Sequence, residues 1–90
     1  MATYTIEFVK SARKEFERLP IKVRAKTAEA LHLLAQNPYS ELLKIKKMKG
    51  TSDLYRIRLG DYRVLYELRT DRLIVIVIKI GHRNEVYRNL

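Results

Sequence analysis

The sequence contains no cysteine and no tryptophan, and it has only three glycines and two prolines in 90 residues. The lack of cysteine excludes disulfides and thiolate metal sites. The longest apolar run, positions 73–78, is far shorter than the roughly 20 residues that a membrane-spanning helix needs. The start of the sequence lacks the apolar core of a signal peptide. We therefore expect a cytoplasmic protein that does not associate with a membrane.

Charge is the most unusual feature of the composition. Nineteen lysines and arginines stand against ten acidic residues, which gives a formal net charge of +9 and a pI near 10.0. A charge of this size says little about the fold but favours anionic partners, namely a nucleic acid, an anionic membrane or an acidic protein. The length indicates a single domain over residues 1–90, since most domains run to roughly 100–150 residues.

The stretch from Leu54 to Tyr66 organises the rest of the chain. Apolar and basic residues alternate on both sides of Gly60-Asp61, which is typical of a strand with one buried face. Gly-Asp suits a two-residue hairpin turn, because glycine tolerates the positive φ of a primed turn. In such a hairpin, the residue numbers of two opposed residues add up to 121. One face would carry Tyr55, Ile57, Leu59, Tyr62, Val64 and Tyr66, and the other Arg56, Arg58 and Arg63.

Like charges that face each other across a hairpin destabilise it. Three arginines on one small patch therefore indicate a site for a polyanion. The alternative is an ordinary solvated basic face, and this stretch alone does not separate the two.

The other elements predict an α+β fold: an N-terminal strand, a two-helix hairpin, then an antiparallel sheet meander packed on the helices. Ser11 is a plausible N-cap of the first helix, and Pro20 separates the two helices. Positions 39–50 form either a loop or a short edge strand protected by lysines. The expected ranges are a strand at 3–9, helices at 11–19 and 21–35, a turn at 50–53, a strand at 72–80, a loop at 81–84 and a last helical turn at 85–90, capped by Asn84.

The strand at 72–80 is apolar on both faces, which is typical of an interior strand covered on both sides. Strand 3–9 is its expected neighbour, and periodicity leaves their relative direction open. Simple alternation places Leu73, Val75 and Val77 on one face and Ile74, Ile76, Ile78 and Ile80 on the other. We expect the final segment or a partner protein to cover the isoleucine face.

The hairpin arginines could converge with Arg83 and Tyr87, which follow the interior strand. Arginine binds phosphate through two parallel hydrogen bonds and stays charged at physiological pH. Several guanidinium groups around one phosphate would stabilise a pentacoordinate transition state. A tyrosine can stack on an unpaired base or transfer a proton. The basic residues Lys46, Lys47 and Lys49 are candidates for RNA binding.

Competing motifs are weak. The three glycines are scattered, so there is no glycine-rich phosphate loop. His32 lies between leucines in the second helix, where we expect a structural or surface role. His82 adjoins Arg83, and its side chain type titrates near neutral pH, so it is a candidate base. Asp and Glu show no clustering typical of metal ligands, and we expect no metal and no other cofactor.

Two segments together resemble the RelE toxins of the RelE/ParE superfamily, over nearly the whole chain. They are LYRIRLGDYRVLY at 54–66 and GHRNEVY at 81–87. The resemblance implies a metal-independent endoribonuclease that cuts mRNA in the ribosomal A site. The 2′-hydroxyl would attack the adjacent phosphate and leave a 2′,3′-cyclic phosphate and a 5′-hydroxyl. It also implies a cognate antitoxin as partner, and an antiparallel sheet in which the first strand lies beside the last.

The resemblance assigns catalytic roles residue by residue. Two family lysines fall on Arg56 and Arg58, and family arginines fall on Arg63 and Arg83. The family tyrosine falls on Tyr87. The first two matches are departures, because a lysine of lowered pKa can act as a base and an arginine cannot. The base is therefore open among His82, Tyr87, a ribosomal RNA group and solvent.

Two further interpretations compete with or extend this one. A ParE-like toxin would share the fold but act by binding DNA gyrase, with the arginines merely solvated. Independently of activity, the +9 charge and the isoleucine face suit an amphipathic, acidic segment of the antitoxin. That segment would cover Leu65, Ile76 or Ile78.

Overall fold

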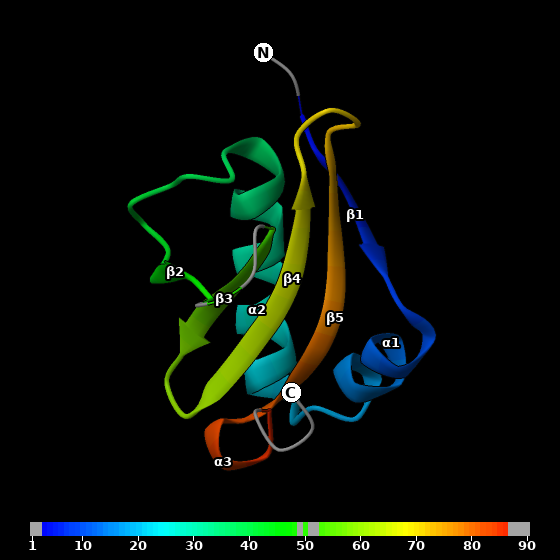
Figure 1. Cartoon of the computed structure of the whole chain (residues 1–90). Helices are drawn as coiled ribbons and strands as arrows, with labels where there is room; N and C mark the ends of the chain where they lie inside the picture. The colour runs from blue at the N-terminus through cyan, green and yellow to red at the C-terminus, as the bar shows by residue number, and fades with distance from the viewer. Residues whose placement is uncertain (1–2, 49, 51–52, 87–90) are drawn as a thin grey trace.

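The computed structural model describes residues 3–48, 50 and 53–86. Five strands form one sheet in the order β1-β5-β4-β3-β2, and α2 runs along one face of it (Figure 1). The α+β fold is confirmed. No described helix has both the length and the apolar character needed to cross a membrane. The elements are β1 (Thr5–Phe8), α1 (Lys10–Glu17), α2 (Ile21–Gln36), β2 (Ile45–Lys47), β3 (Leu54–Leu59), β4 (Tyr62–Arg69), β5 (Ile74–His82) and α3 (Arg83–Val86).

The sheet is mixed, so the expectation of a fully antiparallel sheet is wrong. Strand β1 lies beside β5 as expected, but the two run parallel, with Thr5 opposite Ile74 and Phe8 opposite Val77. Each connection from β2 to β5 reverses the chain, so the direction of β5 follows from that of β2. The α1–α2 pair returns the chain so that β2 runs opposite to β1, which leaves β5 parallel to β1.

The helix pair lies close to the expected ranges, but α1 spans Lys10–Glu17 and so ends two residues before the expected end at Leu19. The N-cap of α1 is Val9, which has an extended backbone, whereas Ser11 lies inside the helix. The prediction that Ser11 caps α1 is therefore wrong. Helix α2 begins directly after Pro20, whose φ of −53° is compatible with the position before a helix. The predicted end of α2 is one residue short of the observed end.

The central hairpin has the predicted register. Leu59 lies opposite Tyr62, Arg58 opposite Arg63, and Ile57 opposite Val64. Gly60 has a φ of +61°, the left-handed conformation that a primed turn requires at its first position. The turn therefore fixes which side chains share a face.

The hydrophobic core lies between the sheet and the helices. Each strand directs alternate side chains toward the helices, as expected for a strand with a period of two. The buried cluster comprises Ala12, Leu19, Leu31, Leu34, Ile57, Val64, Tyr66, Leu68, Val75, Val77 and Ile80.

A β-bulge interrupts the pairing of β4 with β5. Tyr66 lies opposite Val77, but the next residue, Leu65, lies opposite Lys79, so Ile78 is an extra residue in β5. A bulge of this kind shifts the alternation of faces by one residue. Ile80 therefore points into the core and is only 2% exposed. The prediction that it shares the isoleucine face is wrong, while Ile74, Ile76 and Ile78 are half-buried.

Two connecting segments are now defined. Of the two alternatives for positions 39–50, the structure has the short edge strand, β2, paired with β3. The loop expected at 81–84 is wrong, because β5 continues to His82 and α3 begins at Arg83. Asn84 lies inside α3 and does not cap it. Residues 51–52 of the expected turn and 87–90 of the expected last turn lie outside the described residues.

Candidate functional site

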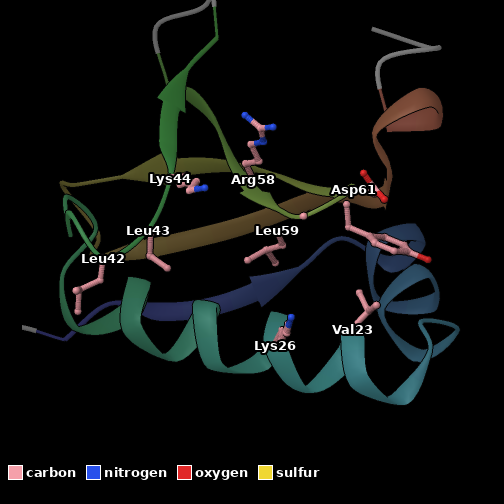
Figure 2. Close-up of a pocket in the computed structure, with 10 residues that line it drawn as sticks. Val23, Lys26, Leu42, Leu43, Lys44, Arg58, Leu59 and Asp61 are labelled. Atoms are coloured by element: carbon pink, nitrogen blue, oxygen red, sulfur yellow. The ribbon is translucent and has the colours of Figure 1, made fainter.

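Arg58 and Arg63 form the centre of the candidate site. They lie directly opposite each other on β3 and β4, so both project from the same face of the sheet. Figure 2 shows Arg58 pointing away from α2, while its neighbour Leu59 points toward α2. On β5, the residue opposite Arg63 is Gly81, which adds no side chain to this row.

Arg63 is held against the hairpin turn. Its Nη1 atom donates hydrogen bonds to the carbonyl oxygens of Gly60, at 2.6 Å, and Tyr62, at 3.0 Å. The residue is only 6% exposed, although it carries a permanent charge. These bonds use Nη1, while Nε and Nη2 carry the remaining donors of the guanidinium fork. Arg63 is thus fixed in orientation before any anion binds.

Arg83 reaches the same turn from the far end of the sequence. Its backbone N–H donates a hydrogen bond of 2.7 Å to the carbonyl oxygen of Asp61. The Arg83 side chain is exposed, as is that of Arg58. The structure therefore places Arg58 and Arg63, from β3 and β4, and the backbone of Arg83, from α3, around Gly60-Asp61. We call these three residues the arginine cluster.

The next row of the sheet is also basic. Arg56 lies opposite Lys46 of β2 and opposite Leu65 of β4, on the face of the arginine cluster. Lys47 pairs with Tyr55, so it belongs to the other face. Of the three predicted binding lysines, the structure thus places Lys46 with the arginines and Lys47 apart from them.

Two predicted site residues, Lys49 and Tyr87, lie outside the described residues.

His82 lies on the opposite face from the arginine cluster. It pairs with Tyr62, and the two rings meet edge to face with centroids 5.8 Å apart. Its Nδ1 atom accepts a hydrogen bond of 3.4 Å from the backbone N–H of Asn84. As a result, the imidazole is oriented toward the helix-covered side of the sheet.

A groove of about 480 Å³ adjoins the cluster on the side of α2. Its lining includes the apolar residues Val23, Leu43 and Leu59, together with Tyr62 and Asp61. Lys26, Lys44 and Arg58 also contribute to its lining, although the side chain of Arg58 points away from α2 (Figure 2). The groove can therefore accept a ligand that has both an apolar part and an anionic part.

Sequence reasoning missed Lys44 and Lys26 as members of this region. The carbonyl oxygen of Lys44 accepts a hydrogen bond of 3.1 Å from the N–H of Arg58, so the two residues are neighbours. The alternation that places Lys46 beside Arg56 could have identified Lys44 as well. No pattern in the sequence relates Lys26 to the hairpin, because only the packing of α2 brings it there.

Permanent cations on one small patch can bind an anion. Opposed arginines repel each other, and a bound phosphate would relieve this repulsion through paired hydrogen bonds. Among the described residues, no three His, Asp or Glu side chains are grouped as metal ligands.

Comparison with known proteins identifies the family. Residues 6–87 match the family described as "ParE toxin of type II toxin-antitoxin system, parDE". The chain is 34% identical to Putative toxin RelE1 of Methanocaldococcus jannaschii, with 96% of this chain and 97% of that protein covered. It is 32% identical to mRNA interferase toxin RelE of Escherichia coli, with 93% and 90% covered.

Solved structures agree with this result. The RelE–RelB complex from Pyrococcus horikoshii contains a chain that matches with a TM-score of 0.79 and 31% identity, covering 93% of this chain and 99% of that one. The intact E. coli RelBE complex matches with a TM-score of 0.77 and 30% identity, covering 88% and 95%. On this evidence, the chain belongs to the RelE/ParE family of type II toxin–antitoxin toxins, as a RelE-type member.

Proposed function

We propose that this protein is the toxin of a type II toxin–antitoxin pair and an endoribonuclease that cuts mRNA on the ribosome without a metal ion. Three observations support this proposal. One relative is named an mRNA interferase. Related chains are found in complexes of RelE with RelB. Two opposed arginines, with a third whose backbone lies beside the same turn, suit the binding of a phosphodiester.

The 2.7 Å hydrogen bond between Arg83 N–H and Asp61 carbonyl oxygen carries the proposal. It joins two segments that the sequence separates by more than twenty positions. The hairpin alone would present two opposed arginines, which a solvated surface could also show. A third arginine whose backbone lies beside the same turn supports the proposal of a convergent anion site, which phosphoryl chemistry requires.

The reaction is an intramolecular transesterification. The 2′-oxygen loses its proton and forms a bond to the adjacent phosphorus. The bond from phosphorus to the 5′-oxygen breaks, and this oxygen takes up a proton. The products are a 2′,3′-cyclic phosphate and a 5′-hydroxyl. In the proposed mechanism, Arg58, Arg63 and Arg83 stabilise the additional negative charge on the phosphorane oxygens.

The proton acceptor is a separate question from charge stabilisation. Arg56 and Arg58 cannot accept the proton at physiological pH. His82 would have to leave its contact with Tyr62 and turn toward the other face to reach the 2′-hydroxyl. Tyr87, a ribosomal RNA group and solvent are the other candidates. We assign Arg56 to phosphate binding, one row from the cluster.

The basic residues beyond the cluster suit contacts with RNA. Lys46 extends the arginine face toward the edge strand β2, so it would meet mRNA or ribosomal RNA next to the cut. We also keep Lys47 and Lys49 as proposed ribosome contacts, because cations near a polyanion raise its affinity whichever face they occupy. A ribosomal target places the active toxin in the cytoplasm, and a cognate antitoxin would keep it inactive.

In vitro translation with analysis of RNA ends tests the proposal. Purified toxin is added to a translating system, and cut sites are mapped by primer extension. We expect cuts in the message at the ribosomal A site, with 2′,3′-cyclic phosphate and 5′-hydroxyl ends. Naked message at the same toxin concentration is the control and should stay intact. Uncut messages at saturating toxin, or equal cutting of naked RNA, would contradict the proposal.

The ParE-like alternative makes a different prediction. A toxin that binds DNA gyrase would block supercoiling of relaxed plasmid by purified gyrase. We expect supercoiling to be unaffected by this protein at concentrations that stop translation. Inhibited supercoiling together with normal translation would favour the alternative.

A further inference from the structure

Strand β5 extends beyond the end of its neighbour β1. The last β1–β5 pair is Phe8 with Val77, and β5 continues to His82. Beyond Val77, this edge of β5 therefore has no strand beside it. Helix α1 occupies the space and packs against the end of β5 (Figure 1). Backbone groups along such an edge need other partners if they are removed from water.

Glu15 of α1 supplies these partners. Its Oε1 atom accepts a hydrogen bond of 3.0 Å from the backbone N–H of Ile80. Its Oε2 atom accepts a bond of 3.2 Å from Nζ of Lys79, which also forms an ion pair. One carboxylate thus binds two consecutive residues of β5 in the place where a strand would have paired. Charged hydrogen bonds of this kind are roughly twice as strong as neutral ones.

These two residues follow the bulge directly. Ile78 is the extra residue, and Lys79 and Ile80 are the first two residues of the shifted register, opposite Leu65 and Val64. The carboxylate therefore holds β5 at the point where its register changes. Bulges commonly lie beside active sites, where they redirect a side chain.

The register change determines which residue meets the hairpin turn. Beyond the bulge, the residue numbers of paired residues in β4 and β5 add up to 144. Arg83 therefore comes opposite Asp61, in agreement with their hydrogen bond. Without the bulge, the sum would remain 143, and His82 would lie opposite Asp61. Arg83 would then lie one residue beyond the turn. The bulge also places Gly81 opposite Arg63, whereas the unshifted register would place Ile80 there.

We propose that Glu15 is a positioning residue for the arginine cluster: it holds the bulged register of β5 and thereby places Arg83 beside the Gly60-Asp61 turn. Glu15 acts through Arg83 and touches no RNA. This inference depends on the proposed endoribonuclease activity for its kinetic readout, and on the β5 register alone for its structural one.

The kinetic test uses single-turnover cleavage of message on programmed ribosomes. We expect Glu15→Ala to lower the maximal cleavage rate by about tenfold to a hundredfold, the loss that a displacement of about 1 Å causes at a catalytic site. The affinity for programmed ribosomes should not change. Glu17→Ala is the matched control, because Glu17 is an exposed glutamate on the same helix. It should cleave as the unmodified protein does.

Two further variants separate register from charge. Glu15→Gln keeps an oxygen acceptor for Ile80 N–H, so it should recover most of the rate lost in Glu15→Ala. Lys79→Gln removes the ion pair and leaves the hydrogen bond to Ile80 N–H. It should therefore lower the cleavage rate less than Glu15→Ala does. If Lys79→Gln matched Glu15→Ala while Glu15→Gln recovered nothing, the ion pair would carry the effect, and the proposal would be wrong.

A double mutant distinguishes positioning from general destabilisation. If Glu15 acts through Arg83, then Glu15→Ala combined with Arg83→Ala should cleave no more slowly than Arg83→Ala alone. Independent losses that multiply would overturn the proposal, because non-additivity is what residues of one unit show.

Amide hydrogen exchange provides a readout that needs no activity. The Ile80 amide should be protected in the unmodified protein and in Glu17→Ala, and it should exchange faster in Glu15→Ala under conditions where core amides remain protected. Equal protection in both variants would overturn the inference. If the unmodified protein cut no message, the proposed function would fail, and the Ile80 amide would still decide the role of Glu15 in the register.

Discussion

The two faces of the sheet differ in what they bury. On the face covered by α2, side chains such as Ile57, Val64 and Val77 have no exposed surface at all. The other face carries the arginine cluster at one end and three half-buried isoleucines at the other. The first face is closed by the protein itself. The second also buries Leu65 completely, which contradicts the prediction of Leu65 as a residue left for the antitoxin to cover. Its exposed arginines and half-buried isoleucines remain accessible.

The comparison shows that burial and function follow different rules on one sheet. On the helix-covered face, apolar side chains are removed from water, which stabilises the fold. On the arginine face, Arg63 is almost as buried as the core residues, yet its charge is satisfied by backbone carbonyls of the turn. Burial of Arg63 fixes the orientation of a cation, whereas Leu65 on the same face is a fully buried apolar side chain.

The largest expected effect is on the arginine face. Replacing Arg83 by alanine should lower the rate of message cleavage by about 10²–10³, because one donor to the transition-state charge is lost. Folding should be little affected, since Arg83 is exposed and its turn contact is through the backbone. Arg72→Ala, an exposed arginine in the turn before β5, is the control. Unchanged A-site cleavage by Arg83→Ala in a toeprinting assay would reject its assigned role.

Substitutions of isoleucine measure the difference between the faces directly. Ile57→Ala empties a fully buried position and should lower the free energy of unfolding by about 3 kcal/mol. Ile76→Ala removes the same atoms from the half-buried face and should cost less than half as much. Urea denaturation of both variants provides the measurement. Equal losses would show that the isoleucine face is as well packed as the core.

Tyr66 carries a polar group into the core. Within the part of the chain that the structure describes, its buried hydroxyl has no hydrogen-bond partner. Tyr66→Phe should therefore raise the free energy of unfolding by about 1 kcal/mol, since an unsatisfied buried hydroxyl is removed. Tyr55→Phe is the control, because the ring of Tyr55 stacks on that of Tyr66 with their centroids 5.7 Å apart. A loss of stability in Tyr66→Phe would mean that the hydroxyl is bonded.

The same residue gives a prediction for alkaline pH. Burial, and then the nearby Tyr55 and Tyr39, raise the pKa of Tyr66 above its ordinary value near 10. The unfolded chain releases this proton from about pH 10 upward, while the folded state retains it. The contribution of Tyr66 to the free energy of unfolding is therefore complete below pH 10, and it falls as the pH rises above 10. Tyr66→Phe should show a smaller loss over this range in urea denaturation.

An effect no larger than that of Tyr66→Phe is expected in the turn before β5. Leu73 has a φ of +55°, in the left-handed region that is costly for a side chain with a Cβ atom. Leu73→Gly should be more stable than Leu73→Ala by about 1 kcal/mol, because both remove the leucine side chain but only glycine relieves the backbone strain. Thermal denaturation of the pair measures the difference. Equal stabilities would indicate that this conformation costs nothing.

Predictions from the sequence were best where the structure is local. The pairing of Arg58 with Arg63 was predicted because a two-residue turn fixes the register of both strands. Arg83 was expected at the same site, but its proximity to Asp61 follows from the pairing of β4 with β5. The position of Ile80 was predicted wrongly, because strict alternation cannot reveal a bulge.

The amino-acid sequence by itself determined the elements, the hairpin register and the separation of arginines from apolar side chains. These depend on periodicity and turn chemistry, which act between residues close in the chain. The tertiary structure alone decided that β1 runs parallel to β5, that β5 shifts register at Ile78, and that Glu15 binds the shifted strand. The physical reason is that β1 and Glu15 meet β5 from segments more than 60 residues away, while the register shift is set between β4 and β5. Packing and hydrogen-bond satisfaction between separate elements decide these features, and local patterns carry no signal for them.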